Sequence, residues 1–358
     1  MKSSIQIEKK IGAGCFANVF LGSNNNIPVA IKIANDDFSN ENSIKYAKYE
    51  VEILKKFKQS NYIINLVDYK INQTENYIIT ELLGNELYTL IRHYRKNGGN
   101  IPRDVVKNIV KQILKGLIEL KSKDILHNDL KVENILITKK LQPIFLNKTK
   151  TIIRSLNRVL LNISEETEQI THYRKYTNVL KHLLLINVQV KIIDFGNAYT
   201  KIIAKKEYDD FSHSRPTRHY ISPEILIRHN HWIESDMWSF GCIAYELLTN
   251  RVLFNPYRDN NMGINSMHLA SIINVFNKPF TNSLLKNGSK SSKYFINNKH
   301  KFAYLIKKNS PLEYLLEFHN IPSNETNQIK QFLLPIFELD PAKRITPDNC
   351  LKSSWLYT

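Results

Sequence analysis

Glycines near the start of the chain form a turn that could approach a phosphate-bearing ligand. Gly12 and Gly14 stand between two strand-like stretches, where backbone N–H groups could reach phosphate oxygens without a Cβ in the way. A hairpin turn also favours glycine, so this signal is weak by itself. Ala17 takes the place of the third glycine in the pattern G-x-G-x-x-G. Because alanine is the smallest replacement, we expect a slightly stiffer turn that keeps its shape.

A lysine follows within an apolar strand. Lys32 lies in the run 29–33, where burial of an unpaired ammonium would be costly. A structural interpretation requires the side chain to reach out to solvent. A functional interpretation gives it two partners, namely nucleotide phosphates and a carboxylate from the next predicted helix. Glu50 fits the second role because apolar residues follow it on the inward face, and Glu52 is the less favoured alternative.

The strongest signal consists of two polar clusters in the middle of the chain. Residues 127–134 read His-Asn-Asp-Leu-Lys-Val-Glu-Asn, and residues 194–196 read Asp-Phe-Gly after a short apolar strand. These clusters resemble the catalytic loop and the D-F-G motif of protein kinases, and their distance from the lysine strand agrees with that family. All four motifs occur in the order that kinases have, which is not expected by chance.

The resemblance implies a site for ATP and Mg²⁺. Lys32 would hold the α- and β-phosphates and would be oriented by Glu50. Asn134 and Asp194 would hold two Mg²⁺ ions, since amide and carboxylate oxygens suit this hard cation. The other cofactor-binding residues that the resemblance implies are Ile11, Gly12, Ala13, Gly14, Val19, Ala30, Glu81 and Leu83.

The resemblance also assigns the catalytic residues. Asp129 would accept the proton of the substrate hydroxyl or orient that hydroxyl for in-line attack. Lys131 matches the lysine that meets the γ-phosphate in serine/threonine kinases, whereas tyrosine kinases usually differ there, so we expect a Ser/Thr acceptor. Asn128 replaces the arginine that normally binds an activation-loop phosphate, which predicts activity without that phosphorylation.

The pattern of elements agrees with a two-lobe protein kinase fold of the α+β class. Strand-like segments surround one predicted helix at 43–57, and long helical patterns follow at 105–121 and 236–248. We therefore expect an N-lobe at 1–83, with a small antiparallel sheet and one helix, and a larger, mainly helical C-lobe at 84–358.

An insert at about 139–188 interrupts the C-lobe, and its segments 152–161 and 173–185 could be helices. Further on, residues 217–224 look like the substrate-docking stretch that ends in a variant of A-P-E. In kinases an arginine that matches Arg344 pairs with the glutamate of this motif, here Glu224.

Further details resemble the SR-protein kinases, which are CMGC-like enzymes that phosphorylate serines in Arg/Ser-rich splicing factors. These details are the His-x-Asp motif, the long insert, Asn-Ala after D-F-G and the segment 267–273. LAMMER-type kinases share His-x-Asp and Thr-Arg-His-Tyr, but their acidic signature is missing. A LAMMER-type or other CMGC kinase with a different substrate is the alternative.

One departure concerns the substrate. SR-protein kinases hold arginine-rich substrates in an acidic groove, and the corresponding positions here are Arg251, Met267 and Asn274. None of them is acidic, and a formal net charge of +17 should repel a cationic substrate at long range. We therefore expect weaker and less salt-sensitive capture of Arg-Ser peptides than the family would suggest.

Composition bounds the remaining possibilities. The chain has 358 residues and three widely spaced cysteines, with neither an apolar membrane span nor a signal segment. We therefore expect an intracellular monomer of the cytoplasm and/or nucleus. The basic residues are spread along the chain, which favours diffuse surface charge over direct nucleic-acid binding. A pseudokinase scaffold is the rival from another class, but Ala17 and Asn128 alone support it.

Overall fold

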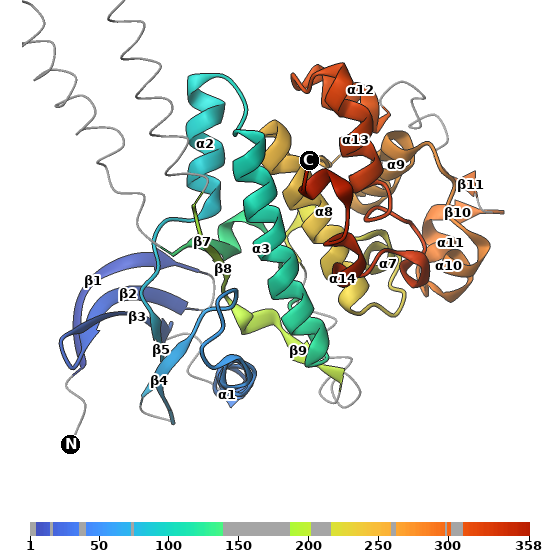
Figure 1. The fold of residues 1–358 in the computed structure, drawn as a ribbon. Coiled ribbons are helices and arrows are strands. Elements are labelled where there is room, and N and C mark those ends of the chain that lie inside the picture. The colour runs from blue at the N-terminus through green and yellow to red at the C-terminus, as the bar shows by residue number, and fades with distance from the viewer. Residues whose placement is uncertain are drawn as a thin grey trace, which may run out of the picture.

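The fold consists of a small sheet with one helix and a larger helical part above and beside it (Figure 1). It is seen in a computed structural model that describes residues 5–14, 17–35, 41–72, 75–138, 187–201, 216–258, 263–297, 299–301 and 311–358. None of the helices in these ranges is long and apolar enough to cross a membrane.

The sheet is antiparallel and has five strands in the order β1-β2-β3-β5-β4. Its strands are β1 (Ile5–Ala13), β2 (Ala17–Asn24), β3 (Ile27–Ala34), β4 (Leu66–Ile71) and β5 (Asn76–Glu81). Asn25 and Asn26 form the tight turn between β2 and β3 with φ of 50° and 64°. Asparagine tolerates this left-handed conformation, which the two-residue hairpin requires.

Alternation along β3 places its lysine. Val29 and Ile31 are 1% exposed and pack with Ile79 on one face of the sheet. Because successive side chains of a strand point to opposite faces, Lys32 points to the other face. Helix α1 (Glu41–Leu54) packs against the sheet and continues in the 3₁₀ turn η2 (Lys55–Phe57).

The helical part is built around α8 (Ile233–Thr249), in which every residue except Glu234 is buried. Its Trp238 contacts three phenylalanine rings at centroid distances of 5.9, 5.8 and 5.1 Å. The other described helices are α2 (Leu87–Asn97), α3 (Arg103–Ser122), α7 (Pro223–Leu226), α9 (Ile264–Phe276), α10 (Asn282–Asn287), α11 (Ser291–Tyr294), α12 (Leu312–Phe318), α13 (Ser323–Leu333) and α14 (Pro347–Cys350).

Short strand pairs join the segments that carry the polar clusters. Strand β6 (Ile125–Leu126) pairs with β9 (Tyr199–Thr200), and β7 (Ile135–Ile137) pairs with β8 (Val190–Ile192). These two pairs bring the segment before β7 beside the segment after β8, which are separated by the insert in the sequence. A further pair, β10 (Phe295–Ile296) with β11 (Lys299–His300), lies farther along the chain.

The predicted α+β, two-lobe fold is confirmed. The helix expected at 43–57 begins at Glu41, and its last three residues are the turn η2. The helices expected at 105–121 and 236–248 are α3 and α8, each slightly longer than predicted. The expected helices at 152–161 and 173–185 lie outside the described residues, and the lobe boundary between residues 83 and 84 stays a prediction.

Candidate active site

A buried carboxylate of α8 holds the loop that follows β6. Asp236 is 2% exposed, and its two oxygens accept hydrogen bonds from the backbone N–H of His127, at 2.7 Å, and of Asn128, at 3.0 Å. Burial raises the pKa of Asp236 to about 7, although both hydrogen bonds favour the ionised form. Asn128 has φ of 66°, a left-handed conformation that asparagine tolerates. The backbone turn before Asp129 is therefore fixed by α8.

Asp129 lies at the centre of a closed network of hydrogen bonds. Its Oδ1 accepts hydrogen bonds from the backbone N–H and the hydroxyl of Thr217, both at 2.9 Å. Its Oδ2 accepts a hydrogen bond from Lys131 Nζ at 2.8 Å, and Lys131 also donates to Thr217 Oγ1 at 3.0 Å. Asn134 Nδ2 donates to the backbone carbonyl of Asp129 at 2.9 Å. This network fixes the carboxylate that the sequence predicted as the proton acceptor.

Lys32 joins two carboxylates from distant segments. Its Nζ lies 2.8 Å from both carboxylate oxygens of Glu50 and 2.9 Å from Asp194 Oδ1. Burial lowers the pKa of Lys32, but Asp194 and Glu50 outweigh burial, so the net shift is upwards. In return, the Lys32 ammonium lowers the pKa of Asp194 to about 2. The structure therefore brings together Lys32 and Glu50, the pair favoured by the sequence, and adds Asp194.

The backbone around Asp194 is set by the aromatic residue that follows it. Asp194 has φ of 61° and ψ of 76°, and it precedes the 3₁₀ turn η5 (Phe195–Asn197). Phe195 is 1% exposed, and its ring packs against Phe57 at 6.0 Å and His127 at 5.0 Å between centroids. A Cβ on Gly196 would lie 3.4 to 3.6 Å from the charged atoms of the Lys32 cluster. The backbone at Gly196 therefore passes within van der Waals distance of the three charged groups.

The predicted cofactor residues fall on strands that surround this cluster. Gly12 pairs with Val19 across β1 and β2, and the N–H of Gly14 donates to Ala17 O at 2.8 Å, which closes the glycine turn. Lys32 in β3 pairs with Val19 as well, so the turn and the lysine belong to neighbouring strands.

Glu81 and Leu83 follow at the end of β5. The carboxylate of Glu81 accepts hydrogen bonds from Lys191 Nζ at 2.6 Å and from the N–H of Asn65 at 2.7 Å. A role of Glu81 at the nucleotide would therefore fall to its backbone. Leu83 is 8% exposed, and the next residue, Gly84, donates its N–H to Ile137 O at 2.7 Å. The link between the lobes is tied to β7 at this point.

Similarity to known proteins agrees with this geometry. A family described as protein tyrosine and serine/threonine kinase matches residues 5–268. Serine/threonine-protein kinase SRPK of Physarum polycephalum is 30% identical over 378 residues, which cover 99% of this chain and 86% of that protein. The chain belongs to the SR-protein kinase family of serine/threonine protein kinases. The predicted enzyme class is thereby confirmed.

Two further relatives align with most of the length of this chain. Protein kinase dsk1 of Schizosaccharomyces pombe is 27% identical, with 98% of this chain and 80% of that protein covered. Dual specificity protein kinase lkh1 of the same organism is 27% identical over 81% of this chain and 37% of its own length. Protein kinases transfer a phosphoryl group from ATP with Mg²⁺ to a protein substrate.

The residues of this kinase fit such a cofactor. Asn134 donates with its Nδ2, so its Oδ1 keeps acceptor capacity, and Asp194 supplies a carboxylate. Among the described residues, no group of three or more His, Cys, Asp or Glu side chains could hold a metal ion. A Mg²⁺ ion at Asn134 and Asp194 would therefore need other oxygen ligands, which nucleotide phosphates and water provide.

The predicted pair of Glu224 and Arg344 is present and fully buried. Arg344 Nη1 and Nη2 lie 2.7 and 3.0 Å from the two carboxylate oxygens, and both side chains are 0% exposed. Arg344 also donates to the carbonyls of Glu234, at 2.6 Å, and Glu338, at 2.9 Å. Burial raises the pKa of Glu224, but Arg344 outweighs burial and the net shift is downwards. The pair fastens the end of the 217–224 segment to the C-lobe.

Sequence reasoning missed Thr217 as a site residue. It is the first residue of the segment 217–224, but its contact with Asp129 depends on how that segment folds over the catalytic loop. A contact between residues 88 positions apart gives no periodic signal. The only sequence clue is the Thr-Arg-His-Tyr motif itself.

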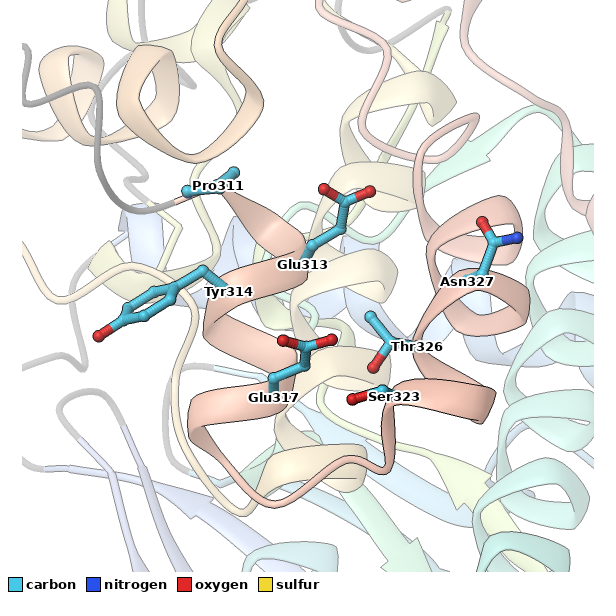
Figure 2. A pocket seen from close by; sticks show the side chains of 7 residues that line it. All are labelled: Pro311, Glu313, Tyr314, Glu317, Ser323, Thr326 and Asn327. Carbon is cyan, nitrogen blue, oxygen red and sulfur yellow. The ribbon is translucent and has the colours of Figure 1, made fainter.

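A pocket of about 430 Å³ lies apart from these residues, between α12 and α13 (Figure 2). Glu317 of α12 and Ser323 and Thr326 at the start of α13 line its middle. Tyr314 also lines the pocket, with its ring directed away from these three side chains. A second lining carboxylate, Glu313, forms an ion pair with Lys330 of α13. This pairing reduces the negative charge that the pocket presents. The pocket is therefore a poor substitute for the acidic groove with which SR-protein kinases hold their substrates.

Proposed function

We propose that this kinase uses Mg·ATP to phosphorylate serines next to arginines in Arg/Ser-rich proteins such as splicing factors, and so regulates mRNA splicing. Its family supports this substrate class. The obstacle is that Arg251, Met267 and Asn274 carry no carboxylate where the family has its acidic groove. A different group of carboxylates, close to the catalytic loop, supports recognition of a cationic side chain.

Three carboxylates from separate elements carry this proposal. Glu133 lies in the 3₁₀ turn η3 (Val132–Asn134), Glu86 precedes α2, and Glu246 lies in α8. Burial raises the pKa of Glu86 and of Glu246, and the charge of Glu133 raises both further. Glu133 is therefore close enough to repel both neighbours, and it is four residues from Asp129.

The charge of this group is only partly balanced within the described residues. Arg95 Nη2 lies 3.6 Å from Glu246 Oε1, and the hydroxyl of Tyr220 donates to Glu246 Oε2 at 2.7 Å. Lys131 lowers the pKa of Glu86. Glu133 Oε2 is buried and has no hydrogen-bond partner among the residues that the structure describes. A buried carboxylate oxygen without a partner is costly, and an arginine of the substrate would relieve that cost.

This arrangement also resolves the problem of net charge. At +17, the molecule as a whole does not attract a cationic peptide. Interactions within a few ångströms are screened far less than those beyond a Debye length, so Glu133 can select arginine after the peptide arrives. We therefore expect discrimination in the chemical step more than in long-range capture.

A peptide series tests the proposal. Peptides that differ only in Arg, Lys or Ala beside one serine would be compared with wild-type enzyme and Glu133→Gln. We expect the variant to lose about 10- to 100-fold in kcat/KM with the Arg peptide, since a hydrogen bond to a charged group contributes roughly 1.5–3 kcal/mol. The Ala peptide should be affected little.

Glu317→Gln is the matched control, because it removes one carboxylate from the pocket between α12 and α13. It should leave the Arg preference unchanged. Equal activity of the wild-type enzyme on the Arg and Ala peptides would refute the substrate proposal. An equal loss on all peptides in Glu133→Gln would instead make Glu133 a structural residue.

The rival functions are separated by two further measurements. Loss of Mg²⁺-dependent transfer in Asp129→Asn is expected for an enzyme, whereas full activity of that variant would remove Asp129 from the role of base. A tyrosine peptide in the same series tests whether this enzyme also phosphorylates tyrosine. The relative lkh1 is named as a dual specificity protein kinase. We propose that the enzyme works inside the cell as a monomer, which sedimentation of the purified chain would check.

A further inference from the structure

One face of α3 carries a row of lysines that the function described so far does not use. Lys107, Lys111 and Lys115 follow one another at intervals of four residues, and Lys123 comes at the end of the helix. Four residues of an α-helix rise by about 6 Å, so the row is roughly 24 Å long. We call these four residues the α3 lysine stripe.

Each lysine of the stripe lies over an aromatic ring. Lys107 lies over Trp355 at 5.6 Å, Lys111 over Tyr357 at 5.1 Å, Lys115 over Tyr62 at 5.5 Å and Lys123 over Phe57 at 5.7 Å. The rings come from both ends of the chain and meet only through the fold. Such contacts orient the ammonium groups without neutralising them.

The stripe keeps its positive charge. Among the described residues, none of its four lysines has an ion pair with a carboxylate. Asp348 binds Lys121 and Asp124 binds Lys201. Glu119, which stands between Lys115 and Lys123 in the row, accepts a hydrogen bond from the Ser60 hydroxyl and keeps its own negative charge, so the uninterrupted positive part of the stripe is Lys107, Lys111 and Lys115. Like charges at i and i+4 repel each other, so the helix is destabilised by this row until an anion lies along it.

We propose that the α3 lysine stripe binds single-stranded nucleic acid. A single strand offers regularly spaced phosphates along its length and bases that stack on aromatic rings, and binding sites for it combine these two features. The ring of Tyr357 is 65% exposed beside Lys111, so it can take a base. In Figure 1 the stripe belongs to the helix that runs down the front of the molecule, and the C-terminal end lies next to it.

Two other anionic partners fit the stripe less well. The apolar side of α3 is buried in the core at residues such as Ile109, Ile113 and Leu117, which leaves no large apolar side chain on this helix exposed for insertion into a membrane. A phosphopeptide presents one or two compact charges, whereas the stripe spreads its lysines over the whole length of α3.

The sequence could not reveal this surface. Its basic residues are spread along the chain, and no cluster of lysines with interleaved aromatics is visible in it. The aromatic partners lie up to 248 positions away in the numbering (Lys107 and Trp355) and are brought in by the packing of α14 and the 3₁₀ turn η9 (Ser354–Leu356) on α3. The sequence predicted only diffuse surface charge, because the aromatic rings reach the α3 lysine stripe through tertiary packing alone.

The test uses the full chain and a fluorescein-labelled poly-U RNA of about 20 nucleotides, with binding followed by anisotropy between about 50 and 200 mM KCl. The variant Lys107→Gln/Lys111→Gln/Lys115→Gln should bind about 100-fold more weakly near 0.1 M salt. The slope of log K against log salt should shrink by about 2, since each phosphate contact of a single strand contributes ~0.7. Activity on a peptide should be unchanged, which separates this test from that of the proposed function.

A matched control removes the same charge elsewhere. Lys96, Lys286 and Lys299 are exposed lysines on other elements, and their triple glutamine variant should keep most of the affinity and the slope. Equal weakening by both triple variants would overturn the proposal, because diffuse charge would then explain the binding. Weak wild-type binding that neither triple variant changes would also overturn it.

The aromatic contribution is tested separately by Tyr357→Leu. We expect a loss of affinity of about 5-fold or more with an unchanged salt slope, since stacking does not release counterions. Vesicles that contain phosphatidylserine form the last arm. If the stripe variant lost vesicle binding but kept RNA binding, the surface would be a membrane site and the proposal would be wrong.

Discussion

The Glu224–Arg344 pair and the Lys32 cluster both join distant segments by charge, but they are built in opposite ways. Arg344 satisfies Glu224 with two hydrogen bonds and directs others to backbone carbonyls, and both side chains are 0% exposed. Lys32 is shared between two carboxylates, and the side chains of Lys32 and Asp194 are 27% and 42% exposed. One group is closed to solvent, and the other is open at Lys32 and Asp194, although its third member, Glu50, is 8% exposed.

The difference shows what each group can do. The guanidinium of Arg344 directs four hydrogen bonds to Glu224 and to two backbone carbonyls and is closed to solvent, so a ligand cannot reach it and the pair can only hold the fold. A lysine with opposite charges on both sides and an exposed surface can exchange one partner for a phosphate. Strongly shifted pKa values in an open site are typical of functional residues, and those of Lys32 and Asp194 fit this description.

Breaking the closed pair should have the largest effect on stability. Arg344→Leu leaves the carboxylate of Glu224 buried without its partner, so we expect the free energy of unfolding to fall by about 3–5 kcal/mol. Urea unfolding followed by circular dichroism measures this loss. The double variant Glu224→Leu/Arg344→Leu should recover part of it, because no isolated charge remains. A loss below about 1 kcal/mol in the single variant would contradict the structural role.

Breaking the open cluster should remove activity and leave most of the stability. Lys32→Met removes a preorganised positive charge at the phosphates, so we expect kcat to fall by about 100- to 1,000-fold. The free energy of unfolding should fall by only about 1 kcal/mol, since Glu50 has a raised pKa and can take up a proton. Peptide phosphorylation and urea unfolding of the same sample measure the two effects.

The control for this prediction lies in the same lobe. Lys55 forms an exposed ion pair with Glu52 at 2.7 Å, and Lys55→Met makes the same exchange of lysine for methionine as Lys32→Met. Neither activity nor stability should change much, because exposed pairs contribute little. A stability loss in Lys32→Met as large as that in Arg344→Leu would erase the contrast between the open and the closed group.

Both groups were predictable from the sequence for the same reason. Lys32 and Glu224 stand in local patterns with fixed spacing, and alternation along β3 shows which face Lys32 takes. The partners Glu50 and Arg344 were found through the family resemblance and the helical register. The energetic character of each group, closed or open, was not predictable, because it depends on burial by elements elsewhere in the chain.

What escaped prediction consists of contacts between elements that carry no shared pattern. Thr217 reaches Asp129 only when the segment after the insert folds back, and Glu86 approaches Glu133 only when α2 packs beside η3. The rings under the α3 lysine stripe are a third case. In each case the local sequence is compatible with several surroundings, and the tertiary fold selects one.

A third charge-related site is the buried ring of His268, for which the described residues provide no ion pair with a carboxylate. His268 of α9 is 0% exposed, and neither ring nitrogen has a hydrogen-bond partner among the residues that the structure describes. Burial, followed by the nearby charges of Arg218 and His219, lowers the pKa of His268 from 6.5 to about 3. The folded state therefore keeps this ring neutral at a pH at which the unfolded chain protonates it.

The sign of the pH dependence follows from this difference. Between about pH 6.5 and about pH 3 the unfolded state binds more protons at His268 than the folded state does, so stability is present above pH 6.5 and is lost as the pH falls. We expect His268 to contribute a loss of roughly 1 kcal/mol between about pH 7.5 and about pH 5.5. This loss is measured as the difference between the wild-type protein and His268→Phe in urea unfolding at each pH, because Asp236, with a pKa of about 7, titrates in the same range with the opposite sign.

His268→Phe should remove this part of the slope, whatever it does to the absolute stability. His93→Phe replaces an exposed histidine of α2 and should leave the slope as it is in the wild-type protein. If the slope of the free energy of unfolding against pH survives in His268→Phe, His268 does not cause it. The wild-type ring would then have to find a partner when it is protonated, and burial would not be what distinguishes His268 from the Lys32 cluster. A lost slope would show that the site of His268 does not tolerate a positive charge, in contrast to the site of Arg344, where an opposite charge is already in place.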